Sequence, residues 1–93
     1  MIYNDLTPRE AIKNGLKASY MNVGKLLTTM KNNMTIDEDV KRNTFYKRLF
    51  NNKRGVTADM WVNVMDALGY DVIIVKRKTG ESMNVYSGDE FEL

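Results

Sequence analysis

The stretch "TADMWVNVMDALGYDVIIV", residues 57–75, changes midway from a helical pattern to a strand pattern. Thr57 is a good N-cap, because its hydroxyl can accept a hydrogen bond from an amide of the first helical turn. Four apolar residues recur at helical spacing and are expected to face the core: Trp61, Val64, Met65 and Leu68. Gly69 follows where helices commonly end in a left-handed turn. The β-branched run Val72–Val75 then favours a strand, so this stretch predicts a helix that leads into a strand.

The segment after this strand predicts its partner. "KRKTGESMNVYS", residues 76–87, contains the turn signal "TG" and then an alternating apolar pattern, which is typical of a hairpin. We therefore expect a single domain over residues 1–93, with a helical core at 7–70, a β-hairpin at 71–87 and an acidic tail at 88–93.

Upstream, "LTPREAIKNGLKASY", residues 6–20, begins with a strong helix-start signal. Thr7 is a suitable N-cap, Pro8 fits the first helical position, and Glu10 completes a capping box. Three residues at four-residue spacing form the expected buried stripe: Ile12, Leu16 and Tyr20. The glycine of this helix, Gly15, suggests a close helix neighbour, since it carries no side chain.

A second, shorter helix is predicted in "MNVGKLLTTMKNN", residues 21–33, with Asn22 as its cap. Its expected core residues follow the pattern of one helical face: Val23, Leu26, Leu27 and Met30. A third helix is predicted in "IDEDVKRNTFYKRLFNN", residues 36–52, with Asp37 or Asp39 as its cap. Phe45 and Leu49 are its expected core anchors.

Composition excludes several kinds of chemistry. The 93 residues include no Cys and no His, which removes disulfides, thiolate zinc sites and Ser–His or Cys–His nucleophiles. The densest carboxylate group, residues 37–39, lacks the Gly and Glu that a calcium loop requires. We therefore expect no enzyme activity, no cofactor and no metal. The N-terminal stretch does not resemble a signal peptide, and the longest apolar run, "VIIV", is too short to span a bilayer, so we expect a cytoplasmic protein.

Charge is unevenly distributed although the formal net charge is only +2. Residues 41–54, "KRNTFYKRLFNNKR", hold six cations and no acid. If Phe45 and Leu49 face the core, a helical projection points three polar residues away from it: Asn43, Thr44 and Lys47. Amide, hydroxyl and ammonium groups hydrogen-bond base edges and phosphates, and Lys53 and Arg54 follow in a loop suited to phosphate contact.

The stretches "PREAIKNGLKAS", "MNVGKLLTTM" and "FYKRLFNNKRGVTADMWVNVMDALGYDVIIVKR" resemble the lambda-repressor-like (Cro-type, XRE) helix-turn-helix regulators of phages and bacteria. The resemblance covers roughly residues 7–77. It implies a mainly α, four-helix helix-turn-helix domain with a C-terminal β-strand or hairpin, whose third helix enters the DNA major groove. The implied base-contacting residues are Arg42, Asn43, Thr44 and Lys47. The implied phosphate-contacting residues are Asn22, Lys25, Lys53 and Arg54.

The leading hypothesis is a sequence-specific double-stranded DNA-binding transcriptional regulator, repressor-like and of phage or mobile-element origin. It would act as a homodimer through the Val72–Val75 strand, with half-sites about one helical turn apart. The alternative is a helix-turn-helix protein-binding module, such as an antitoxin or an anti-CRISPR-like phage inhibitor of a host nucleic-acid-binding enzyme. The acids at 37–39 and in the tail at 89–92 motivate this alternative, because they can mimic DNA charge or meet a basic partner.

Overall fold

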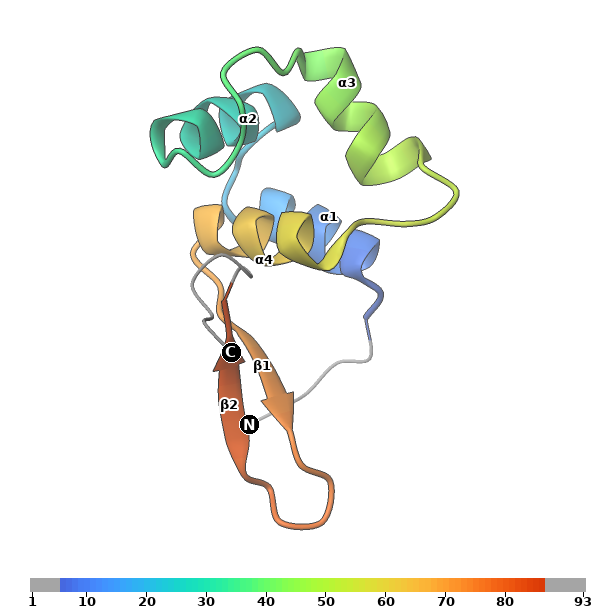
Figure 1. Cartoon of the computed structure of the whole chain (residues 1–93), viewed down its shortest axis with the longest axis vertical. Coiled ribbons are helices and arrows are strands. Elements are labelled where there is room, and N and C mark those ends of the chain that lie inside the picture. The colour runs from blue at the N-terminus through green and yellow to red at the C-terminus, as the bar shows by residue number, and fades with distance from the viewer. Residues whose placement is uncertain (1–5, 87–93) are drawn as a thin grey trace.

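The computed structural model describes residues 6–86 and is mainly helical, with a two-stranded antiparallel hairpin at its C-terminal side (Figure 1). The α-helices are α1 (Pro8–Ala18), α2 (Val23–Asn32), α3 (Arg42–Tyr46) and α4 (Ala58–Ala67), and the strands are β1 (Val72–Val75) and β2 (Ser82–Val85). A π-helical turn, η1 (Lys47–Asn51), continues α3 directly. None of the helices within 6–86 is long and apolar enough to cross a membrane. The predicted acidic tail, 88–93, lies outside the described residues.

The elements form a helical body with a protruding hairpin. Helices α1 and α4 pack against each other, and α2 and α3 lie on one side of this pair (Figure 1). The hairpin extends from the other side, along the longest dimension of the molecule, which is 43 Å. The basic segment and the hairpin therefore lie at opposite ends of the protein.

Side-chain caps fix the beginnings of the helices as the sequence predicts. Thr7 Oγ1 accepts from the Glu10 amide at 3.2 Å, and Glu10 Oε1 accepts from the Thr7 amide at 3.2 Å, which confirms the capping box. Thr57 Oγ1 accepts from the Met60 amide at 3.3 Å at the start of α4. Gly69 follows α4 with a φ of 87°, the left-handed conformation that glycine adopts without strain.

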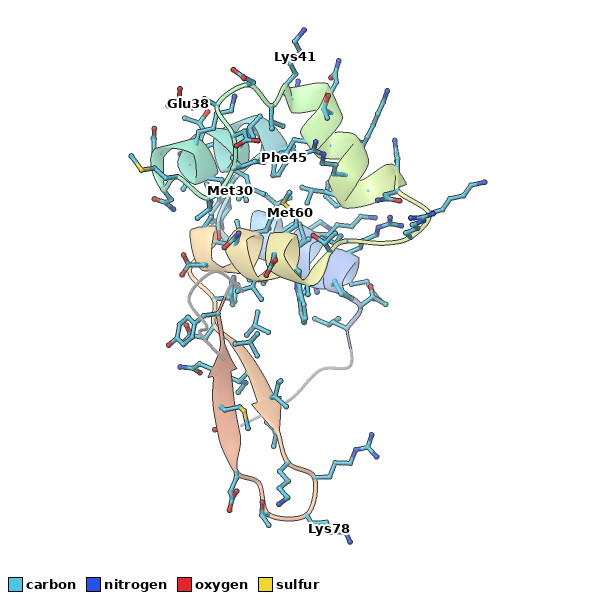
Figure 2. The ribbon with its side chains drawn as sticks, in the orientation of Figure 1. Met30, Glu38, Lys41, Phe45, Met60 and Lys78 are labelled. Carbon is cyan, nitrogen blue, oxygen red and sulfur yellow. The ribbon has the colours of Figure 1, made fainter. Side chains whose placement is uncertain are left out.

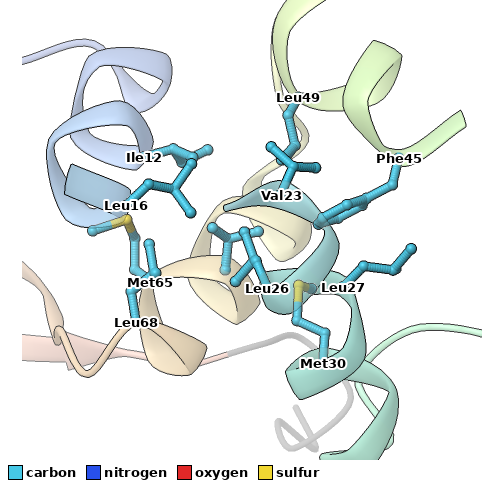
Figure 3. Close-up of a cluster of buried hydrophobic side chains, with 11 residues drawn as sticks. Ile12, Leu16, Val23, Leu26, Leu27, Met30, Phe45, Leu49, Met65 and Leu68 are labelled. Atoms are coloured by element: carbon cyan, nitrogen blue, oxygen red, sulfur yellow. The ribbon is translucent and has the colours of Figure 1, made fainter. Parts of the chain in front are cut away.

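One hydrophobic core joins all four helices (Figure 3). Its members come from α1, α2, the α3–η1 segment, and α4 with its C-cap: Ile12, Leu16, Val23, Leu26, Leu27, Met30, Phe45, Leu49, Val64, Met65 and Leu68. The predicted anchors Phe45 and Leu49 are completely buried, so the basic segment is held by about 2–3 kcal/mol of apolar burial per side chain. Trp61 is only half-buried, although its indole N–H is enclosed without a hydrogen-bond partner among residues 6–86.

The expected close neighbour of Gly15 is the C-terminal end of α4. A Cβ placed on Gly15 would lie 2.9 Å from Leu68 Cδ1 and 3.4 Å from Tyr70 Cε2. The first distance is shorter than a carbon–carbon contact allows, so a side chain at position 15 would require the Leu68 side chain to shift.

The predicted stripe of α1 is wrong at its last residue. Ile12 and Leu16 are buried, but Tyr20 is 96% exposed. The helix ends at Ala18, and Tyr20 adopts a φ of 54°, so the four-residue spacing no longer carries its side chain to the core. Tyr20 instead forms part of the turn between α1 and α2.

The predicted start of the third helix is also wrong. α3 begins at Arg42, and its N-cap is Lys41, which makes no side-chain capping hydrogen bond. The predicted caps Asp37 and Asp39 lie in the loop at 33–41, where the Val40 amide donates to the Asp37 carbonyl at 3.2 Å to close a separate turn. Ile36 and Val40 of this loop pack against the core.

The hairpin forms as predicted. Val72 pairs with Val85 and Ile74 pairs with Met83 in an antiparallel register. Gly80, in the connecting turn, has a φ of 75°, which explains the glycine of the "TG" signal.

Candidate nucleic-acid interface

The α3–η1 segment presents polar groups to solvent along its whole length. Phe45 and Leu49 hold it to the core, and the predicted outward residues Asn43, Thr44 and Lys47 are all exposed. Side chains project from this segment away from the body, beginning with Lys41 at its N-terminal end (Figure 2). The projection from the sequence is therefore correct for this face.

The second half of the segment is a wider, π-helical turn that the sequence did not predict. Within it, half-buried Phe50 packs against Tyr46, with ring centroids 5.0 Å apart and planes tilted by 60°. The Lys13 ammonium of α1 lies 5.7 Å from the centre of the Phe50 ring, within cation–π range. These contacts fix the rotation of the segment against α1. Such π turns are frequent at functional sites.

The N-terminal end of α3 meets the N-terminal end of α2. A Cβ placed on Gly24 would lie 3.6 Å from Arg42 Nε and 3.7 Å from Arg42 Cδ, so the Arg42 side chain lies over this turn of α2. Asn22 Oδ1 caps the helix by accepting from the Lys25 amide at 2.8 Å. Three of the predicted DNA-contacting residues, Arg42, Asn22 and Lys25, thus share one corner.

Lys53 and Arg54 lie at the other end of the segment, beside the start of α1. Together with Thr7, Pro8, Arg9 and two further residues they line a hollow of about 480 Å³. Arg9 Nε donates to the Leu49 carbonyl at 3.1 Å, and Arg9 Nη2 donates to the Asn52 carbonyl, so Arg9 ties the end of η1 to α1. Sequence reasoning missed Arg9, because a tie across 40 or more residues leaves no local signal.

Six cations and no acid lie between positions 41 and 54. No ion pair joins any of these cations to Asp37, Glu38 or Asp39, the exposed acids of the preceding loop. Clustered charges of one sign on one face generate a local potential that attracts polyanions. We call this face the basic surface, and define it by eight residues: Asn22, Lys25, Arg42, Asn43, Thr44, Lys47, Lys53 and Arg54.

An acidic loop borders the basic surface. Asp37, Glu38 and Asp39 are all exposed in the loop that precedes α3. Glu38 and Lys41 lie at the same end of the molecule (Figure 2). Among residues 6–86 no group of acids is arranged to hold a metal ion. The N-terminal end of the basic surface therefore has both signs of charge, whereas the hollow at its C-terminal end is lined by three cations, Arg9, Lys53 and Arg54, and by no acid.

Comparison of the chain with protein-family models, curated proteins and solved structures finds no match. The resemblance to lambda-repressor-like regulators consequently rests on the sequence motifs alone.

Proposed function

We propose that this chain is a sequence-specific double-stranded DNA-binding transcriptional regulator, repressor-like, which lays the α3–η1 segment in the major groove. The observation that carries the proposal is a segment with two fully buried anchors whose outward residues Asn43, Thr44 and Lys47 expose amide, hydroxyl and cationic groups. A helix is ~10–12 Å wide with its side chains, which matches the ~12 Å width of the major groove. The order of helices also supports a helix-turn-helix domain, although the loop at 33–41 is longer than a tight turn.

The residue types on the outward face suit base edges. Asn43 can bond in two places to adenine, and Lys47 can donate to guanine. Arg42, whose side chain lies over the start of α2, can also donate to guanine, a role that the resemblance alone implies. Thr44 offers both a hydroxyl for hydrogen bonding and a methyl group for the methyl of thymine. These four residues are the proposed reading set.

The two ends of the basic surface suit the phosphate backbones on either side of a groove. Asn22 and Lys25 lie at one end, and Lys53 and Arg54 lie at the other. Residues 42–51 extend for roughly 15 Å at the usual helical rise, slightly more than the groove width. Contacts at both ends would fix the register of the reading set on the duplex.

A binding assay tests the proposal directly. Fluorescence anisotropy against the DNA upstream of the gene is measured for wild type and for Asn43→Ala/Lys47→Ala. Losing two base contacts of at least ~1 kcal/mol each should weaken specific binding about 30-fold or more. Asn14→Ala/Lys17→Ala is the matched control, since it removes the same residue types from the exposed face of α1. An undiminished affinity, or an equal loss in the control, refutes α3–η1 as the reader.

A second candidate is a protein-binding module, such as an antitoxin or a phage-encoded inhibitor of a nucleic-acid-binding enzyme. The observation that favours it is the exposed acidic loop, Asp37–Asp39, beside the basic surface. These carboxylates would repel phosphate but attract a basic partner. Neutralising the loop separates the candidates, because it should strengthen DNA binding and weaken binding to a basic protein.

A further inference from the structure

The hairpin exposes apolar side chains on both of its faces. Ile73 is 38% exposed, Ile74 is 57% exposed and Met83 is 67% exposed. Ile74 and Met83 share one face, because they are paired, whereas Ile73 points to the other. An isolated two-stranded hairpin is marginally stable in water, and an exposed β-branched edge strand readily pairs with another strand. The hairpin of this protein projects from the helical body with little cover (Figure 1).

The hydrogen bonds between β1 and β2 show which backbone N–H and C=O groups of β1 point away from β2. The Lys76 amide donates to the Glu81 carbonyl at 2.8 Å. Hydrogen-bonding direction alternates along an antiparallel strand, so Val72 and Ile74 direct their backbone groups to β2 in the same way as Lys76. Ile73 and Val75 direct theirs to the opposite edge, which has no paired strand among residues 6–86. That edge can accept a further strand.

We infer that β1 pairs antiparallel with β1 of a second copy of the chain, with Ile74 on the two-fold axis, to form a continuous four-stranded sheet. An antiparallel edge pairing requires an axis perpendicular to the sheet. A two-fold axis of this kind leaves each side chain on the face of the sheet where it started. Paired residues must therefore be an even number of positions apart, so that one residue of β1 lies opposite the same residue of the second copy. Ile73 and Ile74, at the middle of β1, are the two candidates for this position.

Charge favours Ile74 over Ile73. With Ile74 on the axis, Ile73 faces Val75 of the second copy and Asp71 faces Arg77 of the second copy. This arrangement places an opposite-charge pair at each end of the interface. With Ile73 on the axis, Asp71 would face apolar Val75 of the second copy, and the hairpin tip would reach further along α4 of that copy. With Ile74 on the axis, the basic tip, residues 76–78, lies near the C-terminal end of α4 of the second copy, where cations are favoured.

This interface sets the direction of the two basic surfaces. The hairpin and α3 lie at opposite ends of each molecule, so an antiparallel pairing puts the two α3–η1 segments at the two far ends of the dimer. Two molecules 43 Å long that overlap over roughly 20 Å of paired strand separate these segments by roughly 60 Å. Adjacent half-sites on one duplex are only about 34 Å apart. The hairpin dimer therefore does not fit the half-sites one helical turn apart that the sequence suggested, and it suits two separate DNA segments instead, an inference that rests on the proposed function.

Single cysteines test the pairing, because the chain has no native cysteine. Ile74 lies opposite its own copy in a pair without mutual hydrogen bonds, where Cα atoms are about 4.5 Å apart, within disulfide range. Oxidised Ile74→Cys should run as a covalent dimer on a non-reducing gel, and Ile73→Cys should remain a monomer. Met83→Cys, the control for random collision, is more exposed than Ile74 but lies on the outer strand and should also remain a monomer. Cross-linking of Ile73→Cys alone, of none, or of all three overturns the pairing.

Binding stoichiometry tests the two-ended arrangement. Sedimentation of the cross-linked Ile74→Cys dimer with a short duplex that carries one site should show two duplexes per dimer. One duplex per dimer at saturation overturns the arrangement. If the covalent dimer forms but neither it nor the wild-type chain binds the duplex, the hairpin pairing stands and the DNA-binding proposal fails.

Discussion

Replacing Gly15 by Ala sets two opposing effects against each other. In an exposed helix interior this change stabilises by about 1 kcal/mol, because Ala loses less backbone entropy on folding. At position 15 the new Cβ would lie 2.9 Å from Leu68 Cδ1 and 3.4 Å from Tyr70 Cε2. Leu68 is only 8% exposed, so it has little room to move away. Overpacking of this kind costs ~1–3 kcal/mol, so we expect a net loss of about 1 kcal/mol.

Urea unfolding at 25 °C measures this difference, with Gly24→Ala as the matched variant. A Cβ on Gly24 meets its nearest neighbours at 3.4–3.7 Å, which are ordinary contacts. Gly24→Ala should therefore be neutral or more stable by up to ~1 kcal/mol. Gly15→Ala should lower the melting temperature by roughly 4–8 °C. If both variants gain stability equally, α1 does not approach the end of α4 as closely as described, and the reasoning fails.

Two further predictions concern the basic surface. Lys53→Ala/Arg54→Ala should weaken binding to all DNA sequences alike. The slope of log affinity against log salt concentration should become shallower by about 1.8, since each phosphate contact contributes about 0.9. An unchanged slope between about 50 and 200 mM salt would show that neither cation contacts phosphate. Asp37→Asn/Glu38→Gln/Asp39→Asn should raise DNA affinity by roughly three- to tenfold at low salt, because charges ~10 Å from phosphate repel by a few tenths of a kcal/mol each. A loss of DNA affinity in this triple variant would contradict the proposed docking.

Local signals in the sequence were sufficient for several elements. The caps Thr7, Asn22 and Thr57 were predictable, because each acts on an amide within three residues of itself. The hairpin was predictable because a β-branched run, a glycine turn and an alternating segment follow one another. The anchors Phe45 and Leu49 were predictable from their spacing alone, and the outward face followed from them.

Other features depend on contacts that spacing does not record. Asp37 and Asp39 are residue types that cap helices, so the sequence predicted a third helix that starts too far upstream, whereas both lie in a loop and α3 begins at Arg42. Tyr20 continues a stripe after its helix has ended. The π turn and the role of Arg9 depend on packing between segments distant in the chain. The exposure of Asn43, Thr44 and Lys47 was therefore predictable, but how the two ends of the segment are held was not.

The tie made by Arg9 has a consequence for the order of folding. α3 and η1 together cover only residues 42–51, and a helix this short does not persist alone in water. The segment acquires its shape only after α1 is in place, since Arg9 must reach the Leu49 carbonyl from 40 residues away. Contacts between residues so far apart in the chain form late in folding, because a long loop must close first. We therefore expect the basic surface to be the last part of the helical body to form.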